Sequence, residues 1–229
     1  MRPTVLLVNP NTSAATTAMM QALARAALPD AFALRSATAA RGAAMITSDA
    51  ELATAVGEVL AIAEREAGAV DAIVVAAFGD PALAALRARV AVPVVGIGES
   101  SMREAAEQGR RFGVATTTPG LAVSIAQAVA RLGLAPQFTG TRIPEDDPLR
   151  LAAAPDQQDR LLGEAVQACI AQDGAQAVVI GGGPLAASAE RLAGRFGVPV
   201  ISPVAAAMRR VAAMLSASRA GPGSACSPR

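Results

Sequence analysis

Four loops of this 229-residue chain place hydroxyl, carboxamide, carboxylate or backbone N–H groups directly after short apolar segments. They are Asn9-Pro10-Asn11-Thr12-Ser13, Gly79-Asp80-Pro81, Thr116-Thr117-Thr118-Pro119-Gly120 and Gly181-Gly182-Gly183-Pro184. In open parallel sheets, ligands bind beyond the carboxyl ends of strands, where loops lead into helix N-termini and unpaired N–H groups attract negative charge. Each loop alone is equally typical of a helix cap or a tight turn, but together they favour a site for a small anion or carboxylate.

The composition excludes several kinds of chemistry. All 20 basic residues are arginine, and the chain has no histidine, tyrosine or tryptophan. Without lysine there is no pyridoxal Schiff base and no Walker A loop, and without histidine there is no usual serine triad and no imidazole-ligated zinc. The two cysteines, Cys169 and Cys226, lack the spacing of metal ligands. We therefore expect no metal site.

Two acidic residues near the loops are candidates for proton transfer. Asp80 is expected at the N-cap of a helix that begins at Pro81, and Glu99 is expected at the start of the next helix. Both are equally compatible with helix capping. Burial in a cleft with a raised pKa would favour catalysis, whereas carboxylates that point away as caps would favour a binding protein.

The order of apolar and amphipathic segments predicts an α/β fold with parallel sheets covered by helices. Runs that are apolar on both faces, typical of buried parallel strands, span 5–8, 72–76, 94–97, 112–115, 177–180 and 198–201. Helical patterns span 14–27, 49–66, 81–89, 101–108, 121–132, 157–172, 185–195 and 204–216. The charged segment 142–151 is expected to be a surface connection, and 216–229 a disordered tail.

Two stretches of the chain repeat the same pattern of strand, small-residue loop, helix and Val-Pro-Val strand, at 72–97 and 177–203. The pairs Asn9 and Thr116, Pro81 and Pro184, and Pro93 and Pro199 recur at offsets of 103 to 107 residues. The repeat predicts two pseudo-symmetric lobes with a ligand cleft between them. We assign residues 1–100 with 204–215 to the first lobe and 101–203 to the second.

The motifs of these loops resemble those of the aspartate/glutamate/hydantoin racemase family, in particular its hydantoin and allantoin racemase branch. The matching segments are LLVNPNTS at 6–13, VVAAFGDPALAALR at 74–87, PVVGIGE at 93–99, GRRFGVATT at 109–117 and GAQAVVIGGGPLA at 174–186. The resemblance implies two α/β lobes, no cofactor, and racemisation by two cysteines on opposite sides of the substrate carbon. The family's cysteine positions correspond to Ala77 and Gly182, so both thiols are absent from this chain.

The leading hypothesis is a racemase-family protein that binds a small carboxylate, hydantoin or cyclic ureide in the interlobe cleft, without the two-cysteine mechanism. Asp80, Glu99 or a water would serve as base. The expected binding residues are Asn9, Asn11, Thr12, Ser13, Ala77, Phe78, Gly79, Thr116, Thr117, Thr118, Gly182, Gly183 and Pro184. The alternatives are a non-catalytic binding or regulatory protein, and a lyase or hydrolase with a carboxylate-activated water.

Charge and hydropathy patterning limit the partners and the compartment. The net charge is +1, and no basic face with interleaved aromatic residues is present, so no nucleic-acid partner is expected. No apolar run approaches the roughly 20 residues that span a bilayer, and no secretory signal is recognised, so we expect no membrane partner and a cytoplasmic location. Homo-oligomerisation stays open.

Overall fold

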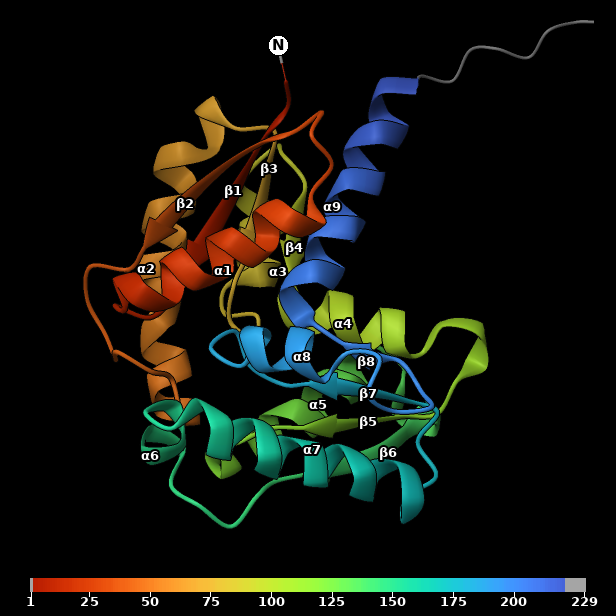
Figure 1. Cartoon of the computed structure of the whole chain (residues 1–229). Coiled ribbons are helices and arrows are strands. Elements are labelled where there is room, and N and C mark those ends of the chain that lie inside the picture. The colour runs from red at the N-terminus through yellow and green to blue at the C-terminus, as the bar shows by residue number, and fades with distance from the viewer. Residues whose placement is uncertain (1, 221–229) are drawn as a thin grey trace, which may run out of the picture.

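The computed structural model describes residues 2–220 and contains two four-stranded parallel sheets flanked by helices (Figure 1). The strands are β1 (Thr4–Asn9), β2 (Ala33–Thr38), β3 (Ala72–Val75), β4 (Val94–Gly96), β5 (Phe112–Ala115), β6 (Phe138–Arg142), β7 (Ala177–Ile180) and β8 (Val200–Ile201). Their order is β2-β1-β3-β4 in one sheet and β6-β5-β7-β8 in the other. The two halves of the chain therefore have the same topology, and the predicted α/β fold class is confirmed.

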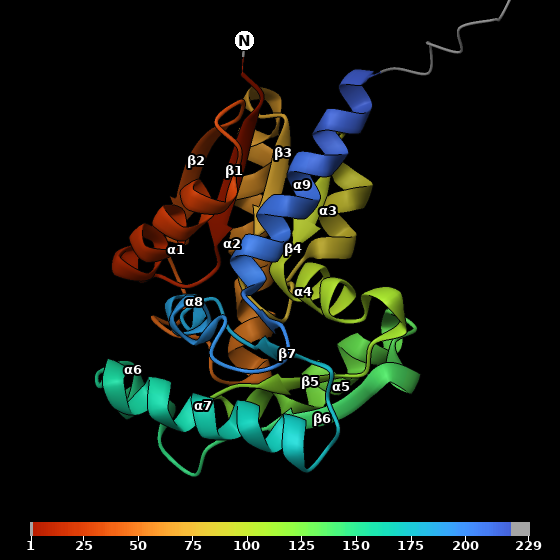
Figure 2. The ribbon, with the colours of Figure 1, turned by 45° about the vertical axis from the view of Figure 1, so that its right-hand side comes forward.

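Helices connect consecutive strands in both halves, as parallel pairing requires. The α-helices are α1 (Ala14–Ala27), α2 (Asp49–Glu66), α3 (Leu83–Arg89), α4 (Ile97–Ala105), α5 (Ala122–Arg131), α6 (Pro148–Ala152), α7 (Pro155–Ala171), α8 (Ala186–Leu192) and α9 (Pro203–Ala220). Short 3₁₀ turns occur at η1 (Ala67–Ala69), η2 (Glu107–Gly109), η3 (Pro119–Leu121) and η4 (Ala135–Gln137). α4 and α8 lie between the two sheets (Figures 1 and 2).

The central strands of both sheets are buried, apart from half-buried Thr4 of β1, and among the edge strands β4 is buried whereas β2 and β6 are not. Every residue of β3, β5 and β7 is buried, which explains why their sequences are continuous apolar runs. β2 and β6 have the mixed sequences ALRSAT and FTGTR, and their residues are mostly half-buried. Continuous apolar runs do not predict these two strands, because their residues are only partly covered and tolerate polar side chains.

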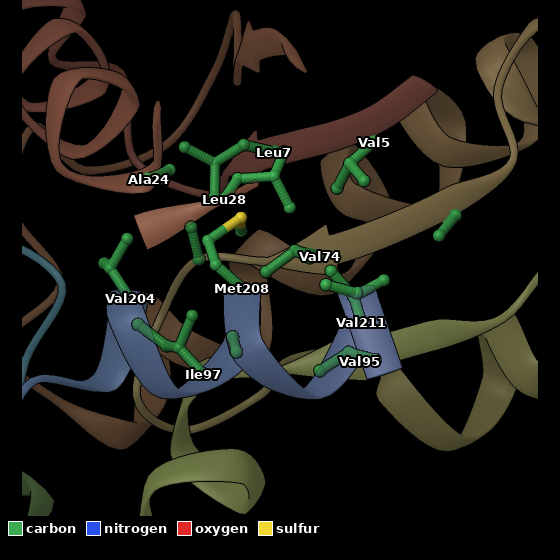
Figure 3. Packing of buried hydrophobic residues seen from close by; sticks show 14 of the residues in the cluster. Val5, Leu7, Ala24, Leu28, Val74, Val95, Ile97, Val204, Met208 and Val211 are labelled. Atoms are coloured by element: carbon green, nitrogen blue, oxygen red, sulfur yellow. The ribbon is translucent and has the colours of Figure 1, made fainter. Parts of the chain in front are cut away.

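The closing helix α9 packs on the first sheet, although it follows the last strand of the second. Its Val204, Met208 and Val211 join a buried cluster with Leu7 of β1 and Val74 of β3 (Figure 3). The chain thus passes between the sheets twice, through α4 and through α9. The lobe boundaries at residues 100 and 203 stay a prediction.

Several predicted boundaries differ from the structure. α9 continues through Ala220, so the predicted tail was wrong for residues 216–220, and residues 221–229 lie outside the described part of the chain. The predicted connection 142–151 contains the start of α6, because Asp147 accepts a hydrogen bond from the N–H of Arg150 and caps the helix. α4 begins at Ile97 rather than residue 101. Within residues 2–220, no helix is both long and apolar enough to cross a bilayer.

Two methionines of α9 provide a matched test of its packing. Met208 is fully buried against the first sheet, whereas the side chain of Met214 is 38% exposed. Truncation of a buried methionine leaves a cavity, so we expect Met208→Ala to lower the free energy of unfolding by about 2–5 kcal/mol. Met214→Ala is expected to lower it by less than about 1 kcal/mol. Chemical denaturation measures both, and equal losses would contradict the packing of α9.

Candidate functional site

A pocket lies where loops from the carboxyl ends of strands in both sheets meet. It is lined by Asn11, Met45, Ile46, Leu52, Ala76, Ala77, Phe78, Gly79, Thr117, Thr118, Leu121, Ile125, Gly181, Gly182, Gly183, Pro184 and Leu185, and we call it the interlobe pocket. Ala77 follows β3 of the first sheet, and Gly182 follows β7 of the second. The two positions that correspond by resemblance to the family's cysteines therefore line the same pocket.

The loop after β1 is closed by its own side chains. Asn9 donates from Nδ2 to Asn11 Oδ1 at 2.8 Å and to Thr17 Oγ1 at 2.9 Å, and the N–H groups of Asn11 and Ser13 donate to side chains of the same loop. The N–H of Thr12 donates to the carbonyl of Ala43. Asn9, Thr12 and Ser13 do not line the pocket, and their hydrogen bonds determine the shape of the loop. Asn11 alone lines the pocket, and its Nδ2 donates to no other described residue.

The loop after β5 contributes Thr117, which has an unpaired hydroxyl, to the lining of the pocket. Thr116 is buried and donates from Oγ1 to the carbonyl of Gly181 at 2.6 Å, which fixes the β5 and β7 loops to each other. Thr117 is also completely buried, but its Oγ1 has no hydrogen-bond partner among residues 2–220. Buried hydroxyls without partners are rare because desolvation costs free energy, so Thr117 Oγ1 indicates a missing partner.

Backbone N–H groups on both sides of the pocket are free to donate. The N–H groups of Ala77, Phe78, Gly79, Thr117, Gly182 and Gly183 donate to no other residue in the described part of the chain. Because nearly all buried backbone N–H groups in proteins are paired, this concentration of unpaired donors favours a bound carbonyl, carboxylate or water. The donors come from the facing ends of β3, β5 and β7.

Apolar side chains that no pattern in the sequence predicts form the rest of the pocket wall. They are Met45 and Ile46 before α2, Leu52 of α2, Leu121 and Ile125 at the start of α5, and Leu185 before α8. Leu121 and Ile125 are one helical turn apart, which was the only local signal for a shared face. No Asp, Glu, Cys or Arg among residues 2–220 lines the pocket.

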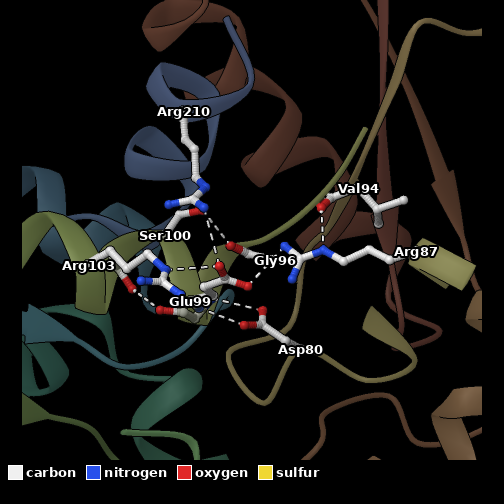
Figure 4. A network of polar contacts seen from close by, with 10 residues as sticks. Asp80, Arg87, Val94, Gly96, Glu99, Ser100, Arg103 and Arg210 are labelled. Atoms are coloured by element: carbon white, nitrogen blue, oxygen red, sulfur yellow. Dashed lines mark hydrogen bonds and ion pairs between the residues drawn. The ribbon is translucent and has the colours of Figure 1, made fainter. Parts of the chain in front are cut away.

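Asp80 does not cap the helix that follows it, so that prediction was wrong. α3 begins at Leu83 after Ala82 and has no side-chain cap, and the N–H of Leu83 donates to the backbone carbonyl of Asp80 rather than to its carboxylate. The Asp80 carboxylate instead accepts the N–H groups of Gly98 at 2.9 Å and Glu99 at 2.6 Å, at the start of α4 (Figure 4). Desolvation raises the pKa of Asp80 to about 7, against the opposing effect of these two amides.

Glu99 lies at the centre of three arginines. Its carboxylate contacts Arg87 of α3 at 2.9 Å, Arg103 of α4 at 3.0 Å and Arg210 of α9 at 3.3 Å (Figure 4). Burial acts to raise the pKa of Glu99, but these guanidinium groups hold it below its usual range. Asp80 and Glu99 line a second hollow on the surface, which shares only Gly79 with the interlobe pocket.

Cys169 does not line the interlobe pocket. It lies on α7, is fully buried, and packs beside the carbonyl of Val114. Burial raises the pKa of its thiol to about 11, so it is not a thiolate near neutral pH. Cys226 is outside the described residues.

Comparison with known proteins identifies the family. The model of the Asp/Glu/hydantoin racemase family matches residues 5–211, so the chain belongs to that family of isomerases. A hydantoin racemase from Rhizobium meliloti is 36% identical over 217 residues, which cover 93% of this chain and 89% of the relative. The structure of allantoin racemase from Klebsiella pneumoniae matches with a TM-score of 0.89 and 29% identity over 94% of this chain and 89% of that chain. A glutamate racemase from Bacillus anthracis, 16% identical with a TM-score of 0.66 over 94% of this chain and 82% of that chain, shares the fold.

The raised pKa of Asp80 predicts a specific pH dependence of stability. Because its pKa in the folded protein lies above the usual 3.8, the folded state binds a proton more tightly than the unfolded state. The contribution of Asp80 to stability is therefore largest at low pH and falls as pH rises from about 4 through 7.

We expect the melting temperature of the wild type, relative to that of Asp80→Asn, to decrease over this range and to level off above it. Asp30→Asn, at a fully exposed carboxylate, is the control and should show no such trend. Thermal denaturation from pH 4 to 8 measures the difference, and a constant difference would contradict the desolvation of Asp80.

Proposed function

We propose that the protein is an isomerase that binds a cyclic ureide with an apolar substituent, such as a 5-substituted hydantoin, in the interlobe pocket. The observation that carries the proposal is the pocket's division into unpaired hydrogen-bond groups at the strand ends and an apolar wall from α2 and α5. Relatives named hydantoin racemase and allantoin racemase match most of the chain, which supports an isomerase over a non-catalytic binding protein or a lyase or hydrolase.

The lining favours an uncharged ligand over a free carboxylate. No guanidinium of the described residues lines the pocket, so a carboxylate would lack a cationic partner. The carbonyl oxygens of a ureide ring can accept from the unpaired N–H groups and from Asn11 Nδ2. A ring N–H can donate to the orphaned Thr117 Oγ1. The apolar wall would then hold the substituent on the ring carbon.

The residues also define what kind of proton transfer is feasible. Removal of the proton from the substituted ring carbon leaves an enolate, whose negative charge resides largely on the adjacent carbonyl oxygen. Backbone N–H groups aimed at that oxygen stabilise it, as in other oxyanion sites. Alanine and glycine at positions 77 and 182 have no group that exchanges a proton, so water or hydroxide takes the proton from one face and water returns it to the other.

The first test concerns the orphaned hydroxyl. Thr117→Val keeps the side-chain shape but removes a buried unpaired group, so the melting temperature should stay the same or rise. The affinity for 5-benzylhydantoin should fall about threefold to tenfold, the effect of one lost hydrogen bond. Calorimetry on the wild type, this variant and Thr54→Val, an exposed threonine of α2, separates the two effects. No binding of any 5-substituted hydantoin by the wild type would refute the proposed ligand class.

The second test concerns the mechanism. We expect the wild type to exchange the substrate's ring-carbon proton slowly in D₂O and without sensitivity to thiol alkylation, since each missing acid or base typically forfeits about 10²–10⁴-fold. The double substitution Ala77→Cys with Gly182→Cys should raise the rate by about 10²-fold or more and make it sensitive to alkylation. A Cβ at Gly182 would lie 3.2 Å from the Leu185 side chain, which must shift, and the φ of 159° at Gly182 is one that residues other than glycine rarely adopt, so the second substitution also strains the backbone. Fast exchange by the wild type would show that a base was missed.

A further inference from the structure

The turn after β3 has an unfavourable backbone conformation at the edge of the interlobe pocket. Asp80 and Ala82 have φ angles of 48° and 63°, in the left-handed region that residues other than glycine rarely adopt. Such a turn persists only where surrounding contacts hold it. The contacts that hold it therefore also determine the shape of the pocket at this edge.

Those contacts come from the first turn of α4. The two carboxylate oxygens of Asp80 accept from the N–H groups of Gly98 and Glu99, one each. α4 has no side-chain cap of its own, because its N-cap residue is Gly96. Asp80 thus supplies, from a distant loop, the acceptor that a serine or aspartate at the N-cap supplies in most helices.

Two glycines of α4 make this close approach feasible. A Cβ at Gly96 would lie 2.3 Å from Asp80 Cγ, and a Cβ at Gly98 would lie 2.0 Å from the carbonyl oxygen of Phe78. Both distances are far shorter than a non-bonded contact allows. Glycine at positions 96 and 98 therefore leaves the space that the turn after β3 occupies.

The residues that the loop after β3 contributes to the interlobe pocket lie next to this turn. Ala77, Phe78 and Gly79 directly precede Asp80 and line the pocket with unpaired N–H groups. The N–H of Asp80 donates to the carbonyl of Ala77 at 2.9 Å, so the position of Asp80 determines where these groups point. α4 leads from β4 towards the second sheet and packs on α9 and β7.

We propose that Asp80 is a positioning residue of the interlobe pocket. It does not line the pocket, but its two hydrogen bonds to the start of α4 fix the N–H groups of Ala77, Phe78 and Gly79 relative to the second sheet. This role affects function only if the interlobe pocket binds the substrate, so it rests on the proposed function. Its test needs no ligand, so it can succeed or fail independently of hydantoin binding.

Hydrogen exchange tests the positioning directly. Peptides that cover residues 74–83 report on the amides of Ala76 and Asp80, which donate to Val8 and Ala77. In Asp80→Ala, exchange of these amides should be about tenfold faster or more, since both hydrogen bonds to the start of α4 are lost. Asp80→Asn keeps one acceptor oxygen and should show a smaller increase. Asp71→Asn is the matched control, because Asp71 lies before the same strand and also accepts a backbone N–H, that of Thr4 at 2.7 Å.

A second variant reaches the same turn without changing the carboxylate. Gly98→Ala forces the Phe78 carbonyl away, so it should also accelerate exchange within 74–83. Unchanged exchange in this segment in both Asp80→Ala and Gly98→Ala, or equal acceleration along the whole chain, would overturn the proposal. If Asp80→Asn binds a hydantoin more weakly than the wild type but has the same melting temperature at that pH, the positioning role of Asp80 also affects ligand binding. If the wild type binds no hydantoin but exchange responds as expected, the ligand class is wrong and the positioning role stands.

Discussion

The turn that follows β3 is held from two sides, and the interlobe pocket depends on it. On one side, Phe78 is buried in the core of the second sheet together with Phe112 and Val114. A Cβ at Gly181 would lie 3.1 Å from the Phe78 ring, so the small residues after β7 make room for it. On the other side, the Asp80 carboxylate is bonded to the start of α4. Two residues separated by one glycine thus join the first sheet's pocket loop to both the second sheet and the connecting helix.

Duplication of the βα unit explains why the pocket is rich in backbone donors. Strand ends of both sheets meet there, and the first residues after a parallel strand have N–H groups that no neighbouring strand accepts. These donors depend on the course of the backbone and not on side-chain identity. The positions at Ala77 and Gly182 can therefore lack thiols while the hydrogen-bonding groups around the pocket remain.

Much of the fold follows from local patterns. The six apolar runs correspond to strands because parallel strands covered on both faces must be apolar on both faces. The same reasoning fails at β2 and β6, since an edge strand tolerates Arg35 or Thr139 with partial exposure. Similarly, the sequence predicts the loops after β1, β3, β5 and β7 as parts of one binding site, and residues of all four loops line one pocket in the structure. The structure divides them further, because Asn11 and Thr117 line the pocket, whereas Asn9 bonds within its own loop and Thr116 bonds to the loop after β7.

The sequence by itself determined the class of fold, the repeat and the loops at the strand ends, because each depends on residues close together in the chain. Only the tertiary structure decided the role of Asp80. The local sequence Gly-Asp-Pro is typical of a cap on the helix that follows, yet the bonding partners of Asp80 are 18 and 19 residues away at the start of α4. The apolar wall from Met45, Leu52 and Ile125 likewise forms only when α2 and α5 pack across the two sheets. Contacts between distant segments are set by packing, and no local pattern of residue types specifies them.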